Sequence, residues 1–188
     1  MSANREIELK ATIRPEQLDK VKDLAAIRKR AVGRARSRKL VTVYYDTPDY
    51  DLCQQGLYLR VRKIGRAYVQ CVKQTHKRLG GIPVRMEWEG PVPSQDPAVS
   101  VIEDKKLRRL IRRAGTARLQ PVFRTDFQRN SRSLKFEDGS TASLDLDIGE
   151  IIAGDVSEPI CEFELELHSG APERLFELAS EIRQAVPF

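Results

Sequence analysis

The sequence has few of the residues that build disulfide frameworks, thiolate metal sites or histidine-based active sites. It contains three cysteines and two histidines in 188 residues. Cys53, Cys71 and Cys161 lie far apart in apolar, strand-like runs, which favours reduced, buried thiols over a disulfide framework or a thiolate metal site. His76 and His168 match no metal-ligand spacing, so we expect both to be incidental surface or loop residues.

Long apolar runs, internal repeats and low-complexity tracts are also absent from the sequence. No stretch has enough consecutive apolar residues to span a bilayer, and residues 1–10 form no apolar targeting segment. The 40% of hydrophobic and 32% of charged residues are typical of a soluble globular protein. We therefore expect a cytoplasmic protein, and its length fits one domain with a sizeable core.

Alternation of charged and apolar residues predicts that much of the chain forms short β-strands. The predicted strands are Arg5–Thr12, Leu40–Tyr45, Leu57–Lys63, Tyr68–Gln74, Val84–Glu89, Val122–Gln128, Arg132–Phe136, Ser140–Glu150 and Ile160–Leu167. Helical periodicity and capping residues predict helices at Pro15–Ile27, Ile102–Ala114 and Pro172–Ala185. Asp138-Gly139 predicts a hairpin turn, and the mixture of elements predicts an α+β fold.

The predicted strands separate an apolar face from an ionic face. Glu6, Glu8 and Lys10 share one face of the first strand, because successive side chains point in opposite directions. The same spacing places on common faces Arg60 with Arg62, Arg85 with Glu87 and Glu89, Asp145 with Asp147, and Glu162 with Glu164 and Glu166. For any single strand, the solvent face of an amphipathic sheet is the simpler interpretation. The segregation of carboxylates and cations onto different strands instead favours a barrel with an ionic interior.

Such an interior suits one class of ligand. Mg²⁺ and Mn²⁺ prefer oxygen ligands from carboxylates and phosphates, and Arg and Lys bind the remaining phosphate oxygens. The pattern therefore indicates a water-filled tunnel that binds a metal and a phosphate chain, with helices packed on its apolar outside.

Several motifs follow one another in a characteristic order along nearly the whole chain. They are Glu6-Ile7-Glu8-Leu9-Lys10, Tyr44–Pro48, Gly56–Arg62, Lys73, Arg85–Glu89, Arg124, Asp147–Gly149 and Cys161–Leu167. This order resembles the CYTH domain, also called the triphosphate tunnel metalloenzyme family. Glu158–Leu167 is similar to the corresponding segment of bacterial inorganic triphosphatases, which often carry a helical CHAD domain after the CYTH domain. We expect residues 1–188 to form a single CYTH domain without a CHAD domain.

The resemblance implies an antiparallel barrel of about eight strands with helices outside. It implies that Mg²⁺ or Mn²⁺ is held by Glu6, Glu8, Asp147, Glu162, Glu164 and Glu166. It implies that the triphosphate is bound by Lys10, Arg60, Arg62, Lys73, Arg85, Arg124 and Arg129, while Glu87, Glu89 and Asp145 also line the tunnel. Glu6 or Glu8 is the expected catalytic residue that orients the attacking water.

The expected activity is metal-dependent hydrolysis of inorganic triphosphate to pyrophosphate and phosphate. The alternatives are a class IV-type adenylate cyclase, a nucleoside or thiamine triphosphatase, and a non-catalytic polyphosphate-binding module. All of them require a triphosphate-containing small molecule as partner, and a homodimer is left open.

Two basic segments stand apart from these motifs. One is Lys29–Lys39, and the other is the predicted helix that carries Lys105, Lys106, Arg108, Arg109, Arg112 and Arg113. Charge runs are usually solvated, so an exposed surface or a tunnel rim is the simplest interpretation. The net charge of +6 would also suit steering of a polyanionic substrate. No base-stacking or groove-reading motif supports nucleic-acid binding, and we expect neither a nucleic-acid nor a membrane partner.

Overall fold

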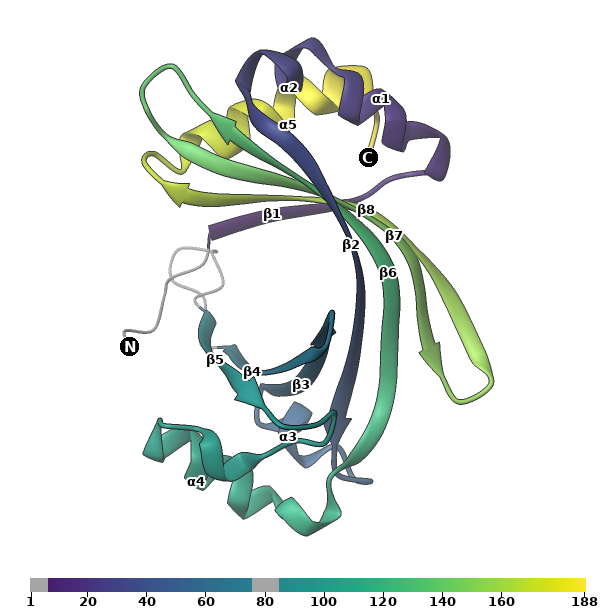
Figure 1. The fold of residues 1–188 in the computed structure, drawn as a ribbon, viewed down its shortest axis with the longest axis vertical. Helices are drawn as coiled ribbons and strands as arrows, with labels where there is room; N and C mark the ends of the chain where they lie inside the picture. The colour runs from purple at the N-terminus through teal and green to yellow at the C-terminus, as the bar shows by residue number, and fades with distance from the viewer. Residues whose placement is uncertain (1–6, 76–84) are drawn as a thin grey trace. The chain divides into compact units, whose positions relative to one another are not determined.

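The computed structural model describes residues 7–75 and 85–188, without the side chains of residues 75, 85 and 86. Its strands are β1 (Ile7–Thr12), β2 (Ala31–Asp46), β3 (Leu57–Ile64), β4 (Ala67–Thr75), β5 (Arg85–Val92), β6 (Gln120–Lys135), β7 (Thr141–Ala153) and β8 (Val156–Ser169). These eight strands form one sheet in the order β1-β8-β7-β6-β2-β3-β4-β5 (Figure 1). The strand pairs β1–β8, β2–β3, β3–β4 and β4–β5 are antiparallel. The predicted α+β fold on about eight antiparallel strands is confirmed.

Strands β2 and β6 differ most from the strands that the sequence predicts. Strand β2 begins at Ala31 instead of Leu40, because its first half carries exposed Arg residues and no apolar side that reveals the period of two. Strand β6 is continuous from Gln120 to Lys135, whereas the sequence predicts two separate strands there. The polar residues in its middle interrupt the apolar pattern but not the strand.

The helices are α1 (Leu18–Asp23), α2 (Ala25–Arg30), α3 (Asp51–Gln54), α4 (Lys105–Ala114) and α5 (Glu173–Ala185), with short 3-10 turns at Pro15–Gln17, Val99–Val101 and Thr116–Arg118. Helix α5 confirms the predicted C-terminal helix. The predicted helix Pro15–Ile27 is divided, because Leu24 has an extended ψ of 136° and separates α1 from α2. None of the helices in the described part of the chain is both long and apolar enough to cross a membrane.

Capping residues determine where α4 begins and ends. The Asp104 side chain accepts hydrogen bonds from the backbone N–H groups of Lys106 and Leu107, so the helix starts after Asp104 instead of at Ile102. It ends at Gly115, whose φ of 101° is readily adopted by glycine, and this confirms the predicted end of the helix.

Helix α3 is not predicted from the sequence, and it is built on the Tyr-Asp-Thr-Pro segment. The buried carboxylate of Asp46 accepts hydrogen bonds from the backbone N–H groups of Thr47, Leu52 and Cys53, at 2.7, 2.9 and 2.9 Å. Thr47 Oγ1 accepts a further one from the Asp51 N–H at 3.0 Å. These side chains satisfy the N–H groups that a helix leaves free in its first turn. The segment is therefore a structural motif in this chain.

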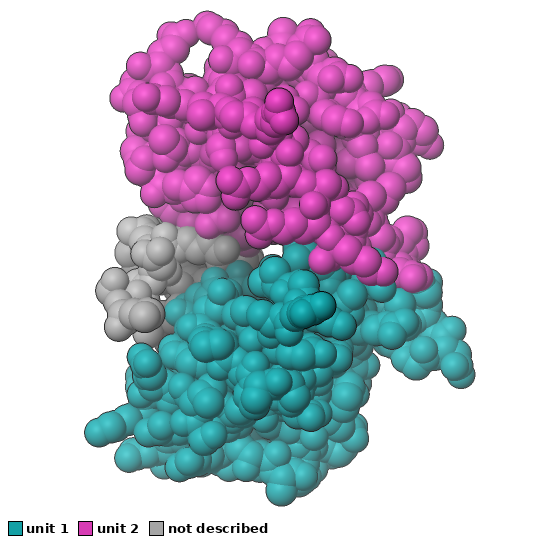
Figure 2. Space-filling model, viewed as in Figure 1, with its two compact units in different colours: residues 1–5, 40–126, 151–157 teal, residues 6–39, 127–150, 158–188 magenta. Residues whose placement is uncertain are grey.

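The described residues form two compact units, each with its own core (Figure 2). Unit 1 contains residues 40–126 and 151–157, and unit 2 contains residues 7–39, 127–150 and 158–188. In unit 1, helix α4 packs through Leu107 and Ile111 on the apolar face of β3 and β4. In unit 2, α5 packs through Leu175 and Leu178 on the apolar face of β7 and β8.

Packing of the helices on one face of the strands assigns the ionic side chains to the other face. Phe163 and Leu165 of β8 are buried in the core of unit 2, so Glu162, Glu164 and Glu166 point away from it. In unit 1, Leu59 and Val61 of β3 are core residues, and Arg60 and Arg62 point to the opposite side. The predicted separation of apolar and ionic faces is therefore confirmed in both units.

Candidate functional site

In unit 2, strand pairing brings Lys10 to the glutamates of β8. Lys10 lies directly opposite Glu164 in the antiparallel pair of β1 and β8. Its Nζ atom forms ion pairs with Glu162 Oε1 at 2.5 Å and with Glu164 Oε1 at 3.1 Å. Glu8 lies opposite Glu166 on the same face, because residues two apart on a strand point the same way.

Arg129 of β6 joins the carboxylates of the two neighbouring strands. Its Nε and Nη2 atoms donate to the two oxygens of Asp147 at 2.8 and 2.6 Å, a bidentate pair. Nη1 donates to Asp145 Oδ2 at 2.8 Å, and Nη2 also donates to Glu164 Oε2 at 2.5 Å. We call the four carboxylates of Asp145, Asp147, Glu162 and Glu164 the acidic cluster. The sequence predicts Arg129 as a phosphate ligand, and its contacts show it as the partner of three carboxylates.

The electrostatics of the acidic cluster follow from burial and from these two cations. Burial, together with the charges of Glu164 and Asp145, raises the pKa of Asp147 despite Arg129. Burial also opposes the charge of Glu164, but Arg129 and Lys10 outweigh it and lower the pKa of that carboxyl. Burial likewise disfavours the charge of Lys10, yet Glu162 and Glu164 raise its pKa. Proximity therefore keeps Lys10 and Glu164 charged, while burial favours the protonated form of Asp147.

The acidic cluster has the donor set of a divalent metal site. One carboxylate oxygen from each of Asp147, Glu162 and Glu164 lies within 4.8 Å of the other two. Asp145 Oδ1 is a buried acceptor that has no hydrogen-bond donor in residues 7–75 and 85–188. Oxygen ligands of this kind suit hard cations such as Mg²⁺ and Mn²⁺, so these residues could hold one.

In unit 1, a second ionic group lies on the face of β3 and β4 opposite to α4. Glu87 of β5 accepts from Lys73 Nζ at 3.3 Å and lies 3.6 Å from Arg60 Nη2. The buried Cys71 Sγ donates to Glu87 Oε1 at 2.8 Å. Arg60 Nε is buried without an acceptor in the part of the chain that the structure describes. We call Arg60, Arg62 and Lys73 the cationic cluster.

Cys71 is the member of this group that sequence reasoning does not identify. Burial and the neighbouring Glu87 carboxylate raise the pKa of the Cys71 thiol to about 12, although Arg60 opposes the shift. The thiol therefore stays protonated and serves as a donor to Glu87. Burial disfavours the Glu87 charge, but the Cys71 hydrogen bond, Lys73 and Arg60 outweigh it and lower the pKa of Glu87. Glu89 lies close enough for one of its oxygens to come within 4.8 Å of Cys71 Sγ and a Glu87 oxygen.

Arg62 and Arg124, two further predicted phosphate ligands, differ in their surroundings. Arg62 Nε donates to Thr42 Oγ1 of β2 at 3.0 Å, on the face of the cationic cluster. Arg124 is exposed on β6. The adjacent Phe123 stacks on Tyr44, with 4.3 Å between the ring centroids, and Tyr44 lies directly opposite Arg60 in the pair of β2 and β3. Strand alternation therefore directs Arg124 to the face opposite the cationic cluster.

Some predicted residues fall outside the described part of the chain. Glu6 and His76 are among them, as is the side chain of Arg85, whose backbone pairs with Thr75. Their predicted roles stay predictions. His168 is half exposed and lies 4.0 Å from Glu166, away from the acidic cluster's own ion pairs.

The cysteine prediction is confirmed in part. All three cysteines are free, and Cys71 and Cys161 are buried. Cys53 is exposed, so the prediction of a buried thiol is wrong at that position. It lies on α3, which turns one side to solvent and buries Leu52 instead.

Comparison with known proteins identifies a relative along most of the chain. The inorganic triphosphatase of Haemophilus influenzae is 31% identical over 180 residues, which are 95% of this chain and 49% of that protein. The chain thus spans about half the length of this curated relative.

Solved structures share the fold. A candidate adenylate cyclase from Bacillus halodurans has a TM-score of 0.62 and 17% identity, covering 100% of this chain and 95% of that chain. A candidate adenylyl cyclase from Hippeastrum with a dominant triphosphatase activity has a TM-score of 0.59 and 18% identity, covering 95% of this chain and 86% of that chain. At such identities the likeness concerns the fold alone. The family model of the CYTH domain matches residues 4–186, and this chain therefore belongs to the CYTH domain family.

Proposed function

We propose that this chain hydrolyses inorganic triphosphate to pyrophosphate and phosphate with the help of a divalent metal ion. The observation that carries the proposal is the acidic cluster, in which Asp147, Glu162 and Glu164 offer oxygens within 4.8 Å of one another beside two cations. The 31% identity to an inorganic triphosphatase supports this choice of substrate.

In the proposal, Asp147, Glu162 and Glu164 hold the metal ion, and Glu6, Glu8 and Glu166 keep their predicted part in metal binding. A bound Mg²⁺ or Mn²⁺ would neutralise charge on the phosphate oxygens and lower the pKa of a bound water. Glu8 lies on the face of β1 that carries Lys10, and Glu6 or Glu8 would orient the attacking water through a carboxylate oxygen.

Arg129 and Lys10 have a positioning role in this scheme. Arg129 fixes Asp147 by two parallel hydrogen bonds and ties it to Asp145 and Glu164, so the carboxylates keep one geometry. Lys10 does the same for Glu162 and Glu164 from the neighbouring strand. A metal site whose ligands are held by such contacts loses little entropy on binding the ion.

Phosphate binding is assigned to the cationic cluster, and Arg85 remains a proposed ligand, whereas Arg124 points away from this cluster and is not assigned to it. Arg60 supports the assignment, since its buried Nε has no acceptor in the described residues and could donate to a phosphate oxygen. Lys73 and Arg60 both contact the carboxylate of Glu87, and the group brings three cationic side chains to one face, which suits an anion.

The test is phosphate release from inorganic triphosphate with Mg²⁺ or Mn²⁺. Glu164→Gln keeps the size of the side chain but removes a charge from the acidic cluster, and we expect it to abolish turnover. The matched control is Glu158→Gln, because Glu158 lies exposed on the same strand, outside the acidic cluster. Equal rates for wild type and Glu164→Gln would refute the assignment. Arg60→Ala should weaken substrate binding more than metal binding.

The same assay separates the alternative activities. Parallel reactions with ATP and thiamine triphosphate compare phosphate release from the three substrates. Formation of cyclic nucleotide from ATP would identify a cyclase instead. Tight triphosphate binding without turnover, across several divalent metals, would identify a binding module.

A further inference from the structure

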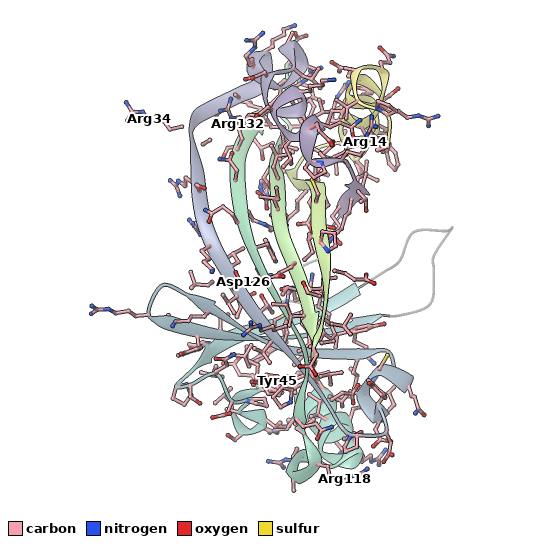
Figure 3. All side chains as sticks on the ribbon, turned by 90° about the vertical axis from the view of Figure 1, so that its right-hand side faces the viewer. Arg14, Arg34, Tyr45, Arg118, Asp126 and Arg132 are labelled. Atoms are coloured by element: carbon pink, nitrogen blue, oxygen red, sulfur yellow. The ribbon has the colours of Figure 1, made fainter. Side chains whose placement is uncertain are left out.

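Strand β2 carries three arginines that belong to neither the acidic cluster nor the cationic cluster. Arg34, Arg36 and Arg38 alternate with Ala35 and Ser37, and all three arginines are exposed. None of their side chains forms a hydrogen bond or an ion pair within residues 7–75 and 85–188, and Figure 3 shows Arg34 projecting away from the ribbon of β2. We call these three side chains the arginine row.

A hydrogen bond between two strands assigns the arginine row to a face of the sheet. Gln128 Nε2 of β6 donates to Ser37 Oγ of β2 at 2.7 Å, so these two side chains share one face. Side chains one position away on either strand point to the other face. Arg36 and Arg38 therefore lie on the same face as Arg129, the partner of the acidic cluster. All of these residues belong to unit 2.

The cations already described in unit 2 are occupied by carboxylates. Every guanidinium nitrogen of Arg129 donates to Asp145, Asp147 or Glu164, and Lys10 pairs with two glutamates. Both side chains are therefore neutralised by carboxylates of the protein itself. Within the described residues, the side chains of the arginine row form no ion pair, so their positive charge remains available to a ligand.

We infer that Arg34, Arg36 and Arg38 form a binding row for the phosphates of a linear inorganic polyphosphate. The inference rests on the proposed function, because it extends the substrate from three phosphates to longer chains. Arginine binds phosphate oxygens with two parallel donors, which suits a chain of phosphates.

The shape of the arginine row favours an extended ligand. Alternate residues on a strand are about 6.7 Å apart, so the row is about 13 Å long. A single phosphate would occupy only one of its arginines. The residues between them, Ala35 and Ser37, are small and offer no aromatic surface for a base, which favours an inorganic chain over a nucleic acid.

The experiment compares two triple variants with the same loss of charge. Arg34→Gln/Arg36→Gln/Arg38→Gln removes the arginine row, and Lys105→Gln/Arg109→Gln/Arg112→Gln removes three exposed cations of α4, in unit 1. Calorimetric titration with a long linear polyphosphate is carried out in a chelating buffer, in which no metal-dependent turnover occurs. Circular dichroism during heating verifies that both variants are folded.

We expect the row variant to bind long polyphosphate about tenfold more weakly than wild type. The plot of log affinity against log salt concentration should be less steep for this variant than for wild type, by about two. The α4 variant should keep its affinity within about twofold. Equal losses in the two variants, or no loss in the row variant, would overturn the inference. A larger loss for single-stranded RNA than for polyphosphate in the row variant would also overturn it.

Failure of this inference can be distinguished from failure of the proposed function. Wild-type turnover of inorganic triphosphate with Mg²⁺, abolished by Glu164→Gln, tests the proposed function without involving the arginine row. Unchanged polyphosphate affinity in the row variant, together with that turnover, would refute the row alone.

Discussion

Replacing Arg129 with Gln removes the cation that three carboxylates share. The side chain of Arg129 is 18% exposed, and those of Asp145, Asp147 and Glu164 are 12%, 1% and 17% exposed. Solvent therefore screens these charges only weakly. Removal of one partner from a buried ion pair leaves an uncompensated charge and typically costs about 3–5 kcal/mol. We expect Arg129→Gln to lower the free energy of unfolding by about this amount at pH 7.

The sign of the pH dependence follows from the carboxyl pKa values. In the wild type the pKa of Glu164 is lowered, so its contribution to stability is present at neutral pH and is lost on acidification. The pKa of Asp147 is raised, so this group favours the folded state more as the pH falls. Without Arg129, both pKa values should rise, and protonation should relieve the repulsion. The difference between variant and wild type should therefore shrink as the pH falls toward about 4.

Urea unfolding at pH 7 and at acidic pH measures this difference. The control is Arg132→Gln, because Arg132 lies on the same strand and has no ion pair in the described residues. We expect the control to change stability by less than about 1 kcal/mol. The explanation would be refuted if both variants lost equal stability, or if the loss for Arg129→Gln grew on acidification.

Three further predictions concern stability and reactivity. Gly170→Ala should lower the free energy of unfolding, measured by thermal unfolding, by about 3 kcal/mol. Gly170 has a φ of 100°, and an added Cβ would overlap Ser140 Oγ and lie 2.8 Å from Ser140 Cα. Gly33→Ala, with a φ of 69° and open space around it, should cost only about 1 kcal/mol, and equal losses would contradict the steric argument. Asp46→Ala should lower the free energy of unfolding in the urea titration by about 2–4 kcal/mol, because it removes three hydrogen bonds to backbone N–H groups. Asp49→Ala removes only an exposed ion pair with Arg118 and should lower it by less than about 1 kcal/mol. In the folded protein at mildly alkaline pH, iodoacetamide should modify the exposed Cys53 and leave Cys71 unmodified. Equal modification of the two cysteines in mass spectrometry would contradict the conclusion that the Cys71 thiol is buried and protonated.

The sequence predicts well what depends on local periodicity. Lys10, Glu162 and Glu164 each alternate with apolar neighbours, so the face they share could be read from the spacing alone. Their pairing across β1 and β8 confirms this prediction. The role of Arg129 could not be read in this way, because its partners lie on two other strands. Alternation gives the face of a side chain, but only the order of strands in the sheet gives its neighbours.

The errors in the predicted elements have a similar origin. The first half of β2 contains Gly33 and exposed arginines, so tertiary pairing and not β-propensity determines its conformation. Helix α3 depends on side chains of Asp46 and Thr47 that reach forward to backbone N–H groups, and the same residues equally predict a plain turn. The face to which Arg124 points follows from Phe123 and Tyr44, a contact between distant segments.

The division of the chain between the two units has a consequence for any attempt to separate them. Strand β2 passes from unit 2 into unit 1 after Lys39, and β6 passes back after Asp126. Neither unit is therefore one uninterrupted piece of polypeptide. No truncation at either end could release the acidic cluster from the cationic cluster as an independent fragment. The two groups of side chains therefore depend on one continuous polypeptide, and a change that unfolds one unit alters the chain connections of the other.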